Sequence, residues 1–276
     1  MEIQWYPGHM AKAERQIREQ ASKADVIIVL GDARAVGVSL NDDFIKSLGK
    51  RKYIVAYNKT TLADDGITES WEKYYNNKDP RVFFTDCSAR RGIAQIKSYL
   101  KEIRKTFKFD RELRMIVAGI PNVGKSMFIN TLLGKLSAKT GNTPGVTRGS
   151  NWIKGSEDYY LLDTPGVLPP KFATAEEGAL LASIGCVKEE ILDKQKLAYY
   201  IIDLLKKHYP DLLAARYKVD PSDRASAELF EEICINRRFI LSGERIDYAR
   251  GANCIIDEFK NGKIGKMSFI SPGDMK

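Results

Sequence analysis

Short apolar segments alternate with amphipathic segments through the first two-thirds of the chain. Five of the apolar segments are rich in β-branched and aromatic residues and contain few polar positions, which is typical of strands buried on both faces of a parallel sheet. These predicted strands are Val26–Leu30, Tyr53–Tyr57, Val82–Thr85, Met115–Gly119 and Tyr159–Leu162. Strands that alternate with helical segments predict an α/β fold with a doubly wound, mainly parallel sheet.

The pattern changes after the Pro169-Pro170 pair, which reads as a linker. From residue 176 onward the apolar positions recur at helical spacing, and no clear strand pattern is present. Two stripes of apolar residues end near Val187 and Tyr209, and further helices are predicted over Ala225–Ile240 and Arg245–Phe259. We therefore predict two domains, an α/β domain over residues 1–174 and an all-α domain over residues 175–276.

Composition places the chain among globular proteins that carry no metal cluster or disulfide framework. Of its 276 residues, 43% are hydrophobic and 29% are charged, as in an ordinary globular protein. The four cysteines lie far apart, and the two histidines are too few for a histidine-rich metal site. No apolar run is long enough for a transmembrane helix, and no secretory signal is evident. We therefore expect a cytoplasmic protein that does not associate with membranes.

The formal net charge of +8 is unevenly distributed along the chain. Its excess lies before residue 175 and is highest between Arg90 and Arg114, where nine basic residues face three acidic ones. The predicted helix Gly92–Thr106 carries much of this charge on one face and apolar residues on the other. Such a region attracts phosphates, but a solvated helix face without a partner explains the charge alone equally well.

A complete phosphate-binding loop follows the fourth predicted strand. The sequence from Gly119 to Ser126 reads GIPNVGKS and opens a predicted helix over Ser126–Leu133, which is the strand–loop–helix context of a P-loop. Its glycines let backbone N–H groups wrap a phosphate chain at a helix N-terminus. Lys125 is expected to reach the β and γ phosphates, and the Ser126 hydroxyl to bind Mg²⁺.

Two further segments downstream complete the triphosphate side of the predicted site. The sequence DTPG, from Asp163 to Gly166, closes the fifth predicted strand, where a carboxylate can hold Mg²⁺ and the Gly166 amide can meet a γ phosphate. Between the P-loop and DTPG lies the TPGVT segment, residues 143–147. We expect Thr147 to supply a second hydroxyl ligand to Mg²⁺ from a switch segment.

The base-reading elements of a GTPase occur before the P-loop, which is the reverse of the usual order. Asn58 and Lys59 follow the second predicted strand, and the Cys87-Ser88-Ala89 triplet follows the third. Both lie at the carboxyl ends of strands, where α/β folds place ligand-binding loops. Moving the chain ends without changing the sheet gives this order, so the sequence predicts a circularly permuted GTPase.

These motifs together resemble the YlqF/RbgA family of circularly permuted GTPases, bacterial factors acting late in assembly of the large (50S) ribosomal subunit. The resemblance covers nearly the whole chain and includes Trp5–Met10, Asp32-Ala33-Arg34, the P-loop, Asp163–Gly166, Pro170–Phe172 and Gly185–Lys188. It implies GTP hydrolysis, GTP and GDP with Mg²⁺ as ligands, and a helical domain that contacts ribosomal RNA. Its expected partners are the large-subunit precursor and its rRNA, with no DNA, and we expect a monomer.

From the motifs and the resemblance we predict which residues form the site. The residues expected to contact nucleotide are Asn58, Lys59, Ser88, Ala89, Asn122, Val123, Gly124, Lys125, Ser126, Met127, Thr147 and Gly166. Mg²⁺ is assigned to Ser126, Thr147 and Asp163. Asn122 matches the P-loop asparagine that related GTPases use to hold K⁺, or it caps the turn. Catalytic roles are assigned to His9, Lys125, Thr147 and Gly166, although His9 could instead contact RNA or serve the turn around it.

Two departures from the family pattern bear on function. Thr61 stands where an NKxD motif has its aspartate, and a hydroxyl cannot accept both guanine donors, so we expect a narrower preference for GTP over ATP. Val167 stands where other GTPases keep a water-orienting glutamine, so the group that aids hydrolysis has to come from elsewhere. Two alternatives remain open: an RNA-binding scaffold with weak turnover, and a GTPase of another RNA-linked pathway such as tRNA modification.

Overall fold

The computed structural model describes residue 15 and residues 17–134, 152–155, 159–164, 166 and 172–274. These residues fall into two compact units. One contains Phe172–Phe269, and the other contains the described residues before residue 172 together with residues 270–274. No helix in the described part of the chain is long and apolar enough to cross a membrane.

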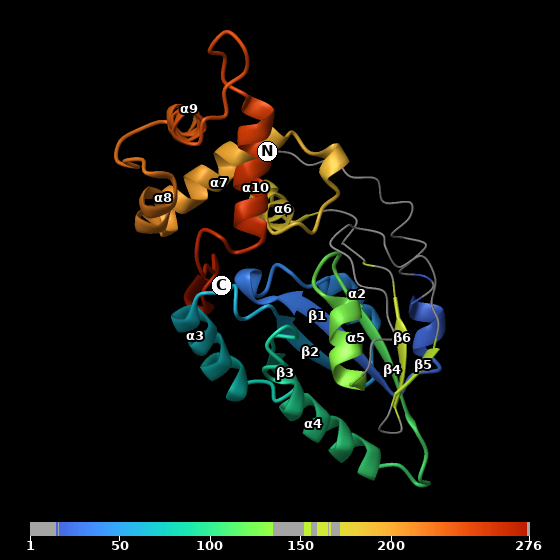
Figure 1. The fold of residues 1–276 in the computed structure, drawn as a ribbon. Coiled ribbons are helices and arrows are strands. Elements are labelled where there is room, and N and C mark those ends of the chain that lie inside the picture. Colours follow the sequence, from blue (N-terminus) through green and yellow to red (C-terminus); the bar gives the residue numbers. More distant parts are fainter. Residues whose placement is uncertain are drawn as a thin grey trace. The chain divides into compact units, whose positions relative to one another are not determined.

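A six-stranded sheet forms the centre of the first unit, with the strand order β3-β2-β1-β4-β6-β5 (Figure 1). Its strands are β1 (Val26–Asp32), β2 (Tyr53–Asn58), β3 (Val82–Phe84), β4 (Leu113–Gly119), β5 (Trp152–Lys154) and β6 (Tyr159–Asp163). All neighbouring pairs are parallel except β5 and β6. The predicted α/β fold with a mainly parallel sheet is therefore confirmed, and all five predicted strands are present. The short strand β5 was not predicted.

Helices cover both faces of this sheet, as the doubly wound prediction requires. They are α2 (Asp42–Ser47), α3 (Asp65–Asn76), α4 (Ile93–Lys105) and α5 (Lys125–Leu133). In Figure 1, α5 lies in front of the sheet and α2 behind it. Phe44 of α2 and Trp71 of α3 are buried against residues of one face of the sheet, whereas α5 contacts β4, β6 and α4.

The starts of α2 and α3 follow from their capping residues. The side chain of Asn41 accepts a hydrogen bond from the Phe44 amide, and that of Asp64 accepts one from the Ile67 amide. Such caps satisfy amide groups that have no partner within the helix. Each helix therefore begins at a fixed point after its strand, which also fixes the length of the loop that precedes it.

Strand register brings the predicted motifs to one edge of the sheet. Asp32 at the end of β1 pairs with Asn58 at the end of β2, and Leu30 pairs with Gly119 at the end of β4. Because the chain moves from β1 outward to β2 and β3 and then returns to the other side of β1 for β4, the strand order reverses there. Ligands of open α/β sheets bind beside the carboxyl ends of the strands at such a reversal.

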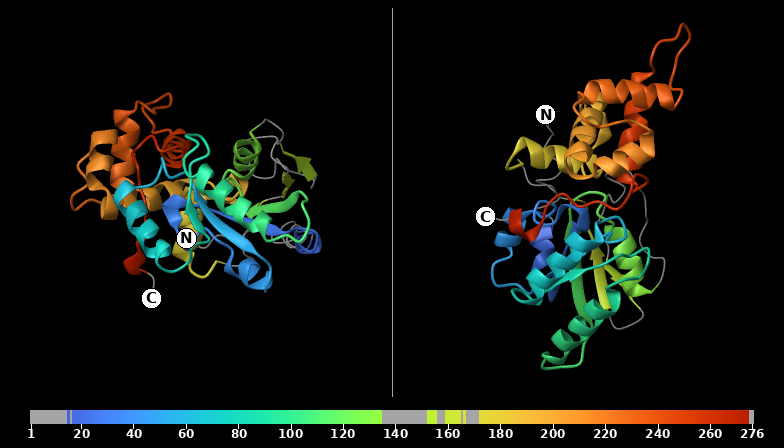
Figure 2. Two further views of the ribbon diagram at one scale, coloured as in Figure 1. Left: turned by 90° about the horizontal axis from the view of Figure 1, so that it is seen from below. Right: turned by 90° about the vertical axis from the view of Figure 1, so that its left-hand side faces the viewer.

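The second unit contains no strand among its described residues; apart from one isolated β-bridge between Ile240 and Ile246, its regular elements are helices. Its helices are α6 (Ala175–Ser183), α7 (Lys194–His208), α8 (Pro210–Tyr217), α9 (Ser226–Asn236) and α10 (Tyr248–Lys260). Helix α7 packs against α6, α8, α9 and α10, and its buried face carries leucine, isoleucine and alanine side chains. Helix α8 was not predicted, because Pro210 was taken as a helix end, whereas it occupies the first turn of a new helix. Figure 2 shows these helices from two further directions.

The C-terminal segment belongs to the first unit. The indole Nε1 of Trp71 in α3 donates a hydrogen bond to the Ile270 carbonyl over 2.9 Å, and Ile270 packs against the apolar cluster around Trp71 and Tyr57. A 3-10 helix over Pro272–Asp274 also contacts α3. The chain therefore leaves the α/β unit for its helical part and returns to it at the end.

Candidate functional site

The P-loop connects β4 to α5 as predicted. Gly124 ends the loop with a φ of +96°, and a Cβ at this position would lie 2.6 Å from Nδ2 of Asn58, so no other residue type fits without displacement. Lys125 begins α5, and its Nζ donates to the carbonyls of Gly119 and Ile120 at 3.2 and 2.8 Å. These contacts hold the lysine ammonium over the loop that is expected to carry the phosphates.

The two described residues predicted to bind Mg²⁺ lie together. The Oγ of Ser126 is 3.2 Å from Oδ2 of Asp163. Asp163 is the last residue of β6, which pairs with β4. Thr164 anchors the next position, because its Oγ1 donates to the Val117 carbonyl over 2.6 Å. A hydroxyl and a carboxylate at this separation are hard oxygen ligands of the kind that Mg²⁺ prefers. These residues therefore fit the predicted metal.

Gly166 reaches the P-loop from the other side. A Cβ at Gly166 would lie 2.8 Å from the backbone of Pro121, so the end of the DTPG segment approaches the P-loop as closely as only glycine permits. This places the Gly166 backbone near the region of the loop where a terminal phosphate is expected. Thr147, the other residue assigned to this side, lies outside the described residues, and so does His9.

Asn58 joins three loops through one buried side chain. Its Nδ2 donates to the Val123 carbonyl of the P-loop at 2.9 Å, and its Oδ1 accepts from the Cys87 amide at 3.1 Å. The Thr85 hydroxyl also lies 3.4 Å from Oδ1. The amide side chain therefore braces the base-reading loops against the P-loop.

Lys59, a predicted nucleotide contact, belongs to a buried ion cluster with Asp32 and Arg34. Asp32 and Arg34 were not assigned to the site from the sequence. Asp32 receives two hydrogen bonds from the Arg34 guanidinium, both of 2.9 Å, and its Oδ2 lies 3.0 Å from the Lys59 Nζ. Burial alone would raise the pKa of Asp32, but the charges of Arg34 and Lys59 hold that pKa well below its ordinary value. Lys59 also has a φ of +67°, an uncommon backbone conformation for this residue. The Asp-Ala-Arg triplet at a strand end was the available signal.

Asp86 is a second residue that sequence reasoning missed. Its Oδ2 accepts from the amide and hydroxyl of Thr61 at 3.2 and 2.5 Å. Its Oδ1 accepts from the Ser88 amide and hydroxyl at 2.8 and 2.5 Å, and from the Ala89 amide at 3.0 Å. The residues predicted to support the base, Ser88 and Ala89, therefore surround this carboxylate. An acidic residue immediately before the predicted triplet was the overlooked signal.

The remaining predicted nucleotide contacts lie on the P-loop and the first turn of α5. Asn122 adopts a left-handed backbone conformation with a φ of +57°, and Val123 is buried. Met127 exposes 43% of its surface on α5. In the described part of the chain, no group of three or more His, Cys, Asp or Glu residues is arranged to hold a metal ion.

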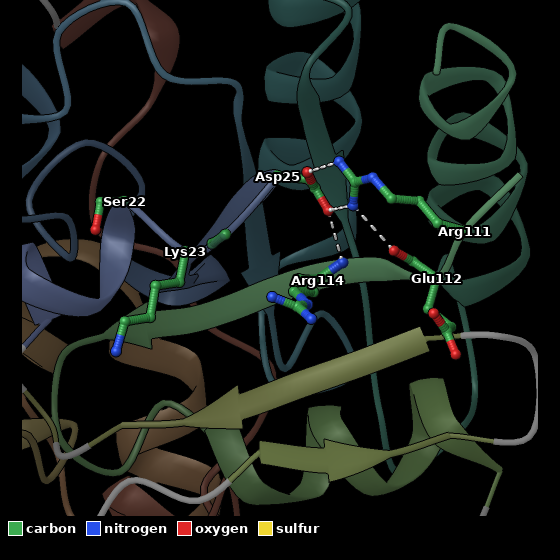
Figure 3. Close-up of a pocket in the computed structure, with 7 residues that line it drawn as sticks. Ser22, Lys23, Asp25, Arg111, Glu112 and Arg114 are labelled. Carbon is green, nitrogen blue, oxygen red and sulfur yellow. Dashed lines mark hydrogen bonds and ion pairs between the residues drawn. The ribbon is translucent and has the colours of Figure 1, made fainter. Parts of the chain in front are cut away.

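A separate pocket lies at the opposite ends of the strands, before β1 and β4 (Figure 3). Asp25 receives a fork of two hydrogen bonds from the Arg111 guanidinium, at 2.6 and 2.8 Å, and one from the Arg114 amide at 2.9 Å. Burial would raise the pKa of Asp25, but these partners, Arg111 foremost, lower it below its ordinary value. Part of the basic segment between Arg90 and Arg114 thus serves the fold.

The chain matches two families of GTPases. Residues 26–173 match the RsgA GTPase family, and residues 114–241 match a family described as 50S ribosome-binding GTPase. The first match spans both the base-reading loops and the P-loop.

Relatives that match nearly the whole chain are also GTPases. Ribosome biogenesis GTPase A of Bacillus cereus is 40% identical over 281 residues, which cover 99% of this chain and 95% of that protein. Its counterpart of the same name from Thermotoga maritima is 27% identical over 99% of this chain and 96% of its own length. The GNP-bound structure of YlqF from T. maritima shares the fold, with a TM-score of 0.67 at 24% identity over 96% of this chain and 100% of that one. The chain therefore belongs to the ribosome biogenesis GTPase A family and is a GTPase whose motifs run in circularly permuted order.

Proposed function

We propose that this GTPase acts in the cytoplasm, late in assembly of the large ribosomal subunit, and binds its precursor and rRNA as a monomer. The observation that carries the proposal is similarity over 99% of the chain to a protein named ribosome biogenesis GTPase A. The described site supports the GTPase part of the proposal, because the P-loop, the residues predicted to bind Mg²⁺ and the base-reading loops meet at one edge of the sheet. In this proposal residues 1–174 form the nucleotide domain, joined by the C-terminal segment that packs on α3, and the helices within residues 175–276 form the domain that contacts RNA.

In this proposal each predicted residue on the triphosphate side of the site has a role. Lys125 contacts the β and γ phosphates, and the Gly166 amide meets the γ phosphate. Ser126, Asp163 and Thr147 would hold Mg²⁺, which would neutralise phosphate charge. The 3.2 Å separation of the Ser126 and Asp163 oxygens supports this assignment. GTP would order the segment around Thr147, and its hydrolysis would release that segment and change the affinity for the particle.

Water activation requires a group from outside the described site. Valine at position 167 offers no hydrogen bond to water, so hydrolysis by the isolated protein should be slow. We assign the missing assistance to the large-subunit particle, to a K⁺ ion held beside Asn122, and to His9. A histidine has a pKa range that suits proton transfer.

A basic and aromatic segment offers a contact for rRNA on the first unit. Lys108 is exposed and Phe109 exposes 80% of its surface in the connection between α4 and β4. Several neighbouring charges are used within the fold, since Arg104 pairs with Asp110 and Lys105 with Glu102. Lysine supplies a phosphate contact, and an exposed aromatic ring can stack on an unpaired base.

The deciding experiment is GTP turnover with and without purified 50S subunits. We expect slow turnover alone and acceleration by 50S of roughly 10³-fold, as when a partner supplies a missing transition-state group. The variant His9→Ala should lose most of the stimulated rate while binding GDP normally. The paired variant Lys108→Ala with Phe109→Ala should instead weaken 50S binding without changing turnover of the isolated protein.

The same experiment separates the alternatives. Stimulation below about tenfold would point to an RNA-binding scaffold, because arginine-finger partners give far more. Co-sedimentation with tRNA rather than with 50S precursors would point to another RNA-linked pathway. Either result would overturn the proposed function and leave the GTPase family assignment intact.

A further inference from the structure

Thr61 and Asp86 form a close polar pair across two neighbouring loops. The Thr61 hydroxyl donates to Oδ2 of Asp86 over 2.5 Å, and the Thr61 amide donates to the same oxygen at 3.2 Å. The loops themselves are joined by a hydrogen bond from the Thr60 amide to the Thr85 carbonyl at 3.2 Å. A carboxylate therefore touches the position where the motif of other GTPases has its own carboxylate.

The Asp86 carboxylate is held in one orientation by backbone groups. The amides of Ser88 and Ala89 donate to Oδ1 at 2.8 and 3.0 Å, and the side chain is 3% exposed. Burial would raise the pKa of Asp86, but the Ser88 and Thr61 donors and the Ala89 amide bring it below its ordinary value. The group is therefore ionised at neutral pH and can only accept hydrogen bonds.

Two of its donors are exchangeable. The Thr61 and Ser88 hydroxyls rotate about a single bond, whereas the amides of Thr61, Ser88 and Ala89 are fixed by the backbone. Together they make five contacts to the two oxygens, and one hydroxyl is bound to each oxygen. If the Thr61 and Ser88 side chains rotate away about χ1, the three amides still hold the carboxylate, and the contact that each hydroxyl made becomes available to an outside donor.

The other acidic residues near position 61 are committed elsewhere. Asp64 accepts the Ile67 amide at 2.9 Å as the cap of α3, and Asp65 is the first residue of that helix. Turning Asp64 toward the base would remove the cap. Asp86 is thus the acidic side chain that the described structure brings into contact with Thr61.

We propose that Asp86 is the residue that selects guanine in this chain, in place of position 61. Guanine presents its ring N1–H and its exocyclic amine as two parallel donors, and an ionised carboxylate accepts both. Adenine presents no such pair. The acceptor has moved from the loop after β2 to the loop after β3, and Thr61 has become its hydrogen-bonding neighbour. The proposal rests on guanine nucleotide binding by this family and is independent of any ribosomal partner.

The first test replaces the carboxylate by an amide of the same shape. Asp86→Asn should weaken GDP binding by at least about tenfold, because hydrogen bonds to a charged acceptor are lost. Xanthine carries a carbonyl oxygen where guanine has its amine, so the asparagine NH₂ should strengthen XDP binding by a similar factor. Affinities for fluorescent GDP, XDP and ADP are measured by titration. Loss of GDP affinity without any gain for XDP, in a variant that melts at the parent temperature, would overturn the proposal.

The second test moves the carboxylate back to the other loop. Asp86→Ser alone should lose at least about tenfold in GDP affinity, and Thr61→Asp combined with Asp86→Ser should recover most of it. Failure of the double variant to recover GDP affinity, with normal melting, would show that Asp86 only braces the loops. This pair carries the test if Asp86→Asn fails to fold.

Two controls complete the design. Thr61→Val removes one hydroxyl and should leave the preference for GDP over ADP in place. Asp64→Ala removes the cap of α3 and should lower the melting temperature without changing base preference. All of these measurements use the isolated protein, so their failure is distinguishable from a failure of 50S stimulation, which bears on the proposed function alone.

Discussion

Nδ2 of Asn58 donates to the carbonyl oxygen of Val123 over 2.9 Å, although the two residues are 65 positions apart in the chain. This bond fastens the loop after β2 to the P-loop. Because Oδ1 of Asn58 also accepts the Cys87 amide, the relative position of phosphate and base sites depends on one buried side chain. Asn58 therefore links the base-reading loops after β2 and β3 to the P-loop after β4, which lies later in this permuted chain.

Replacing Asn58 should therefore destabilise the nucleotide unit even without nucleotide. Asn58→Ala leaves a buried carbonyl and a buried amide without a partner, which we expect to lower the free energy of unfolding by about 2–4 kcal/mol. Chemical denaturation of the nucleotide-free protein measures the change. Asn77→Ala is the matched control, because Asn77 is exposed and, among the described residues, its side chain bonds to the Lys73 carbonyl in the last turn of α3. Equal losses for the two variants would contradict the bracing role.

The buried cluster around Asp32 gives a second prediction. Asp32→Asn leaves the Arg34 guanidinium, which is 1% exposed, without its carboxylate partner, and breaking a buried ion pair in this way costs about 3–5 kcal/mol. Urea denaturation at pH 7 should show this loss. Asp79→Asn is the control. It breaks the ion pair with Arg81, which is more exposed than the pair of Asp32 and Arg34, and should cost at most about 1 kcal/mol.

The same cluster predicts how the penalty depends on pH. The folded pKa of Asp32 is depressed, so its ionisation stabilises the fold at every pH above its unfolded value of about 4. This contribution is lost as the pH falls from about 4 toward the lower folded pKa. The stability difference between the parent and Asp32→Asn should therefore be constant from pH 7 to pH 5 and shrink below about 4. A difference that stays constant at lower pH would contradict this account.

The fold was largely predictable because the strands are apolar on both faces, and because loop motifs mark their carboxyl ends. What sequence patterns could not supply were contacts between side chains of different loops. Asp86 reads as an ordinary polar residue until it is seen to accept hydrogen bonds from Thr61 and Ser88. Strands β3 and β5 both have three residues, but β5 ends in a lysine and lacks the continuous apolar run of β3. Helix α8 was concealed by Pro210, which is compatible with either the end of a helix or the start of one.

Magnesium binding should depend on the Ser126 hydroxyl. Ser126→Ala removes one predicted ligand and leaves Asp163 in place, so the gain in GDP affinity on adding Mg²⁺ should fall by about tenfold, while affinity in EDTA stays close to that of the parent. Ser70→Ala is the control, because the Ser70 hydroxyl bonds to the Gly66 carbonyl of its own helix. An unchanged Mg²⁺ response in Ser126→Ala would remove this residue from the metal site.

The rate of GTP hydrolysis in K⁺ and in Na⁺ should show whether the Asn122 side chain holds a cation or serves only the turn. If its side chain helps to hold K⁺ beside the phosphates, hydrolysis should be faster in K⁺ than in Na⁺ at equal ionic strength, and Asn122→Ala should abolish that difference. A role in the turn alone predicts equal rates in the two salts. The comparison is made with GTP turnover of the isolated protein at saturating nucleotide.

The return of the C-terminal segment to α3 should stabilise the nucleotide unit. Removing residues 270–276 deprives the Trp71 Nε1–H of the Ile270 carbonyl, 2.9 Å away, and uncovers part of the apolar cluster around Trp71. We expect a loss of about 0.5–1.5 kcal/mol from the hydrogen bond, in addition to the loss of apolar contact. Trp71→Phe removes that donor in the full-length chain, so truncation should cost less in the Trp71→Phe background than in the parent. Denaturation of the four proteins forms a double-mutant cycle. Strict additivity of the two losses would show that the hydrogen bond does not contribute, and that the segment acts only through apolar contact.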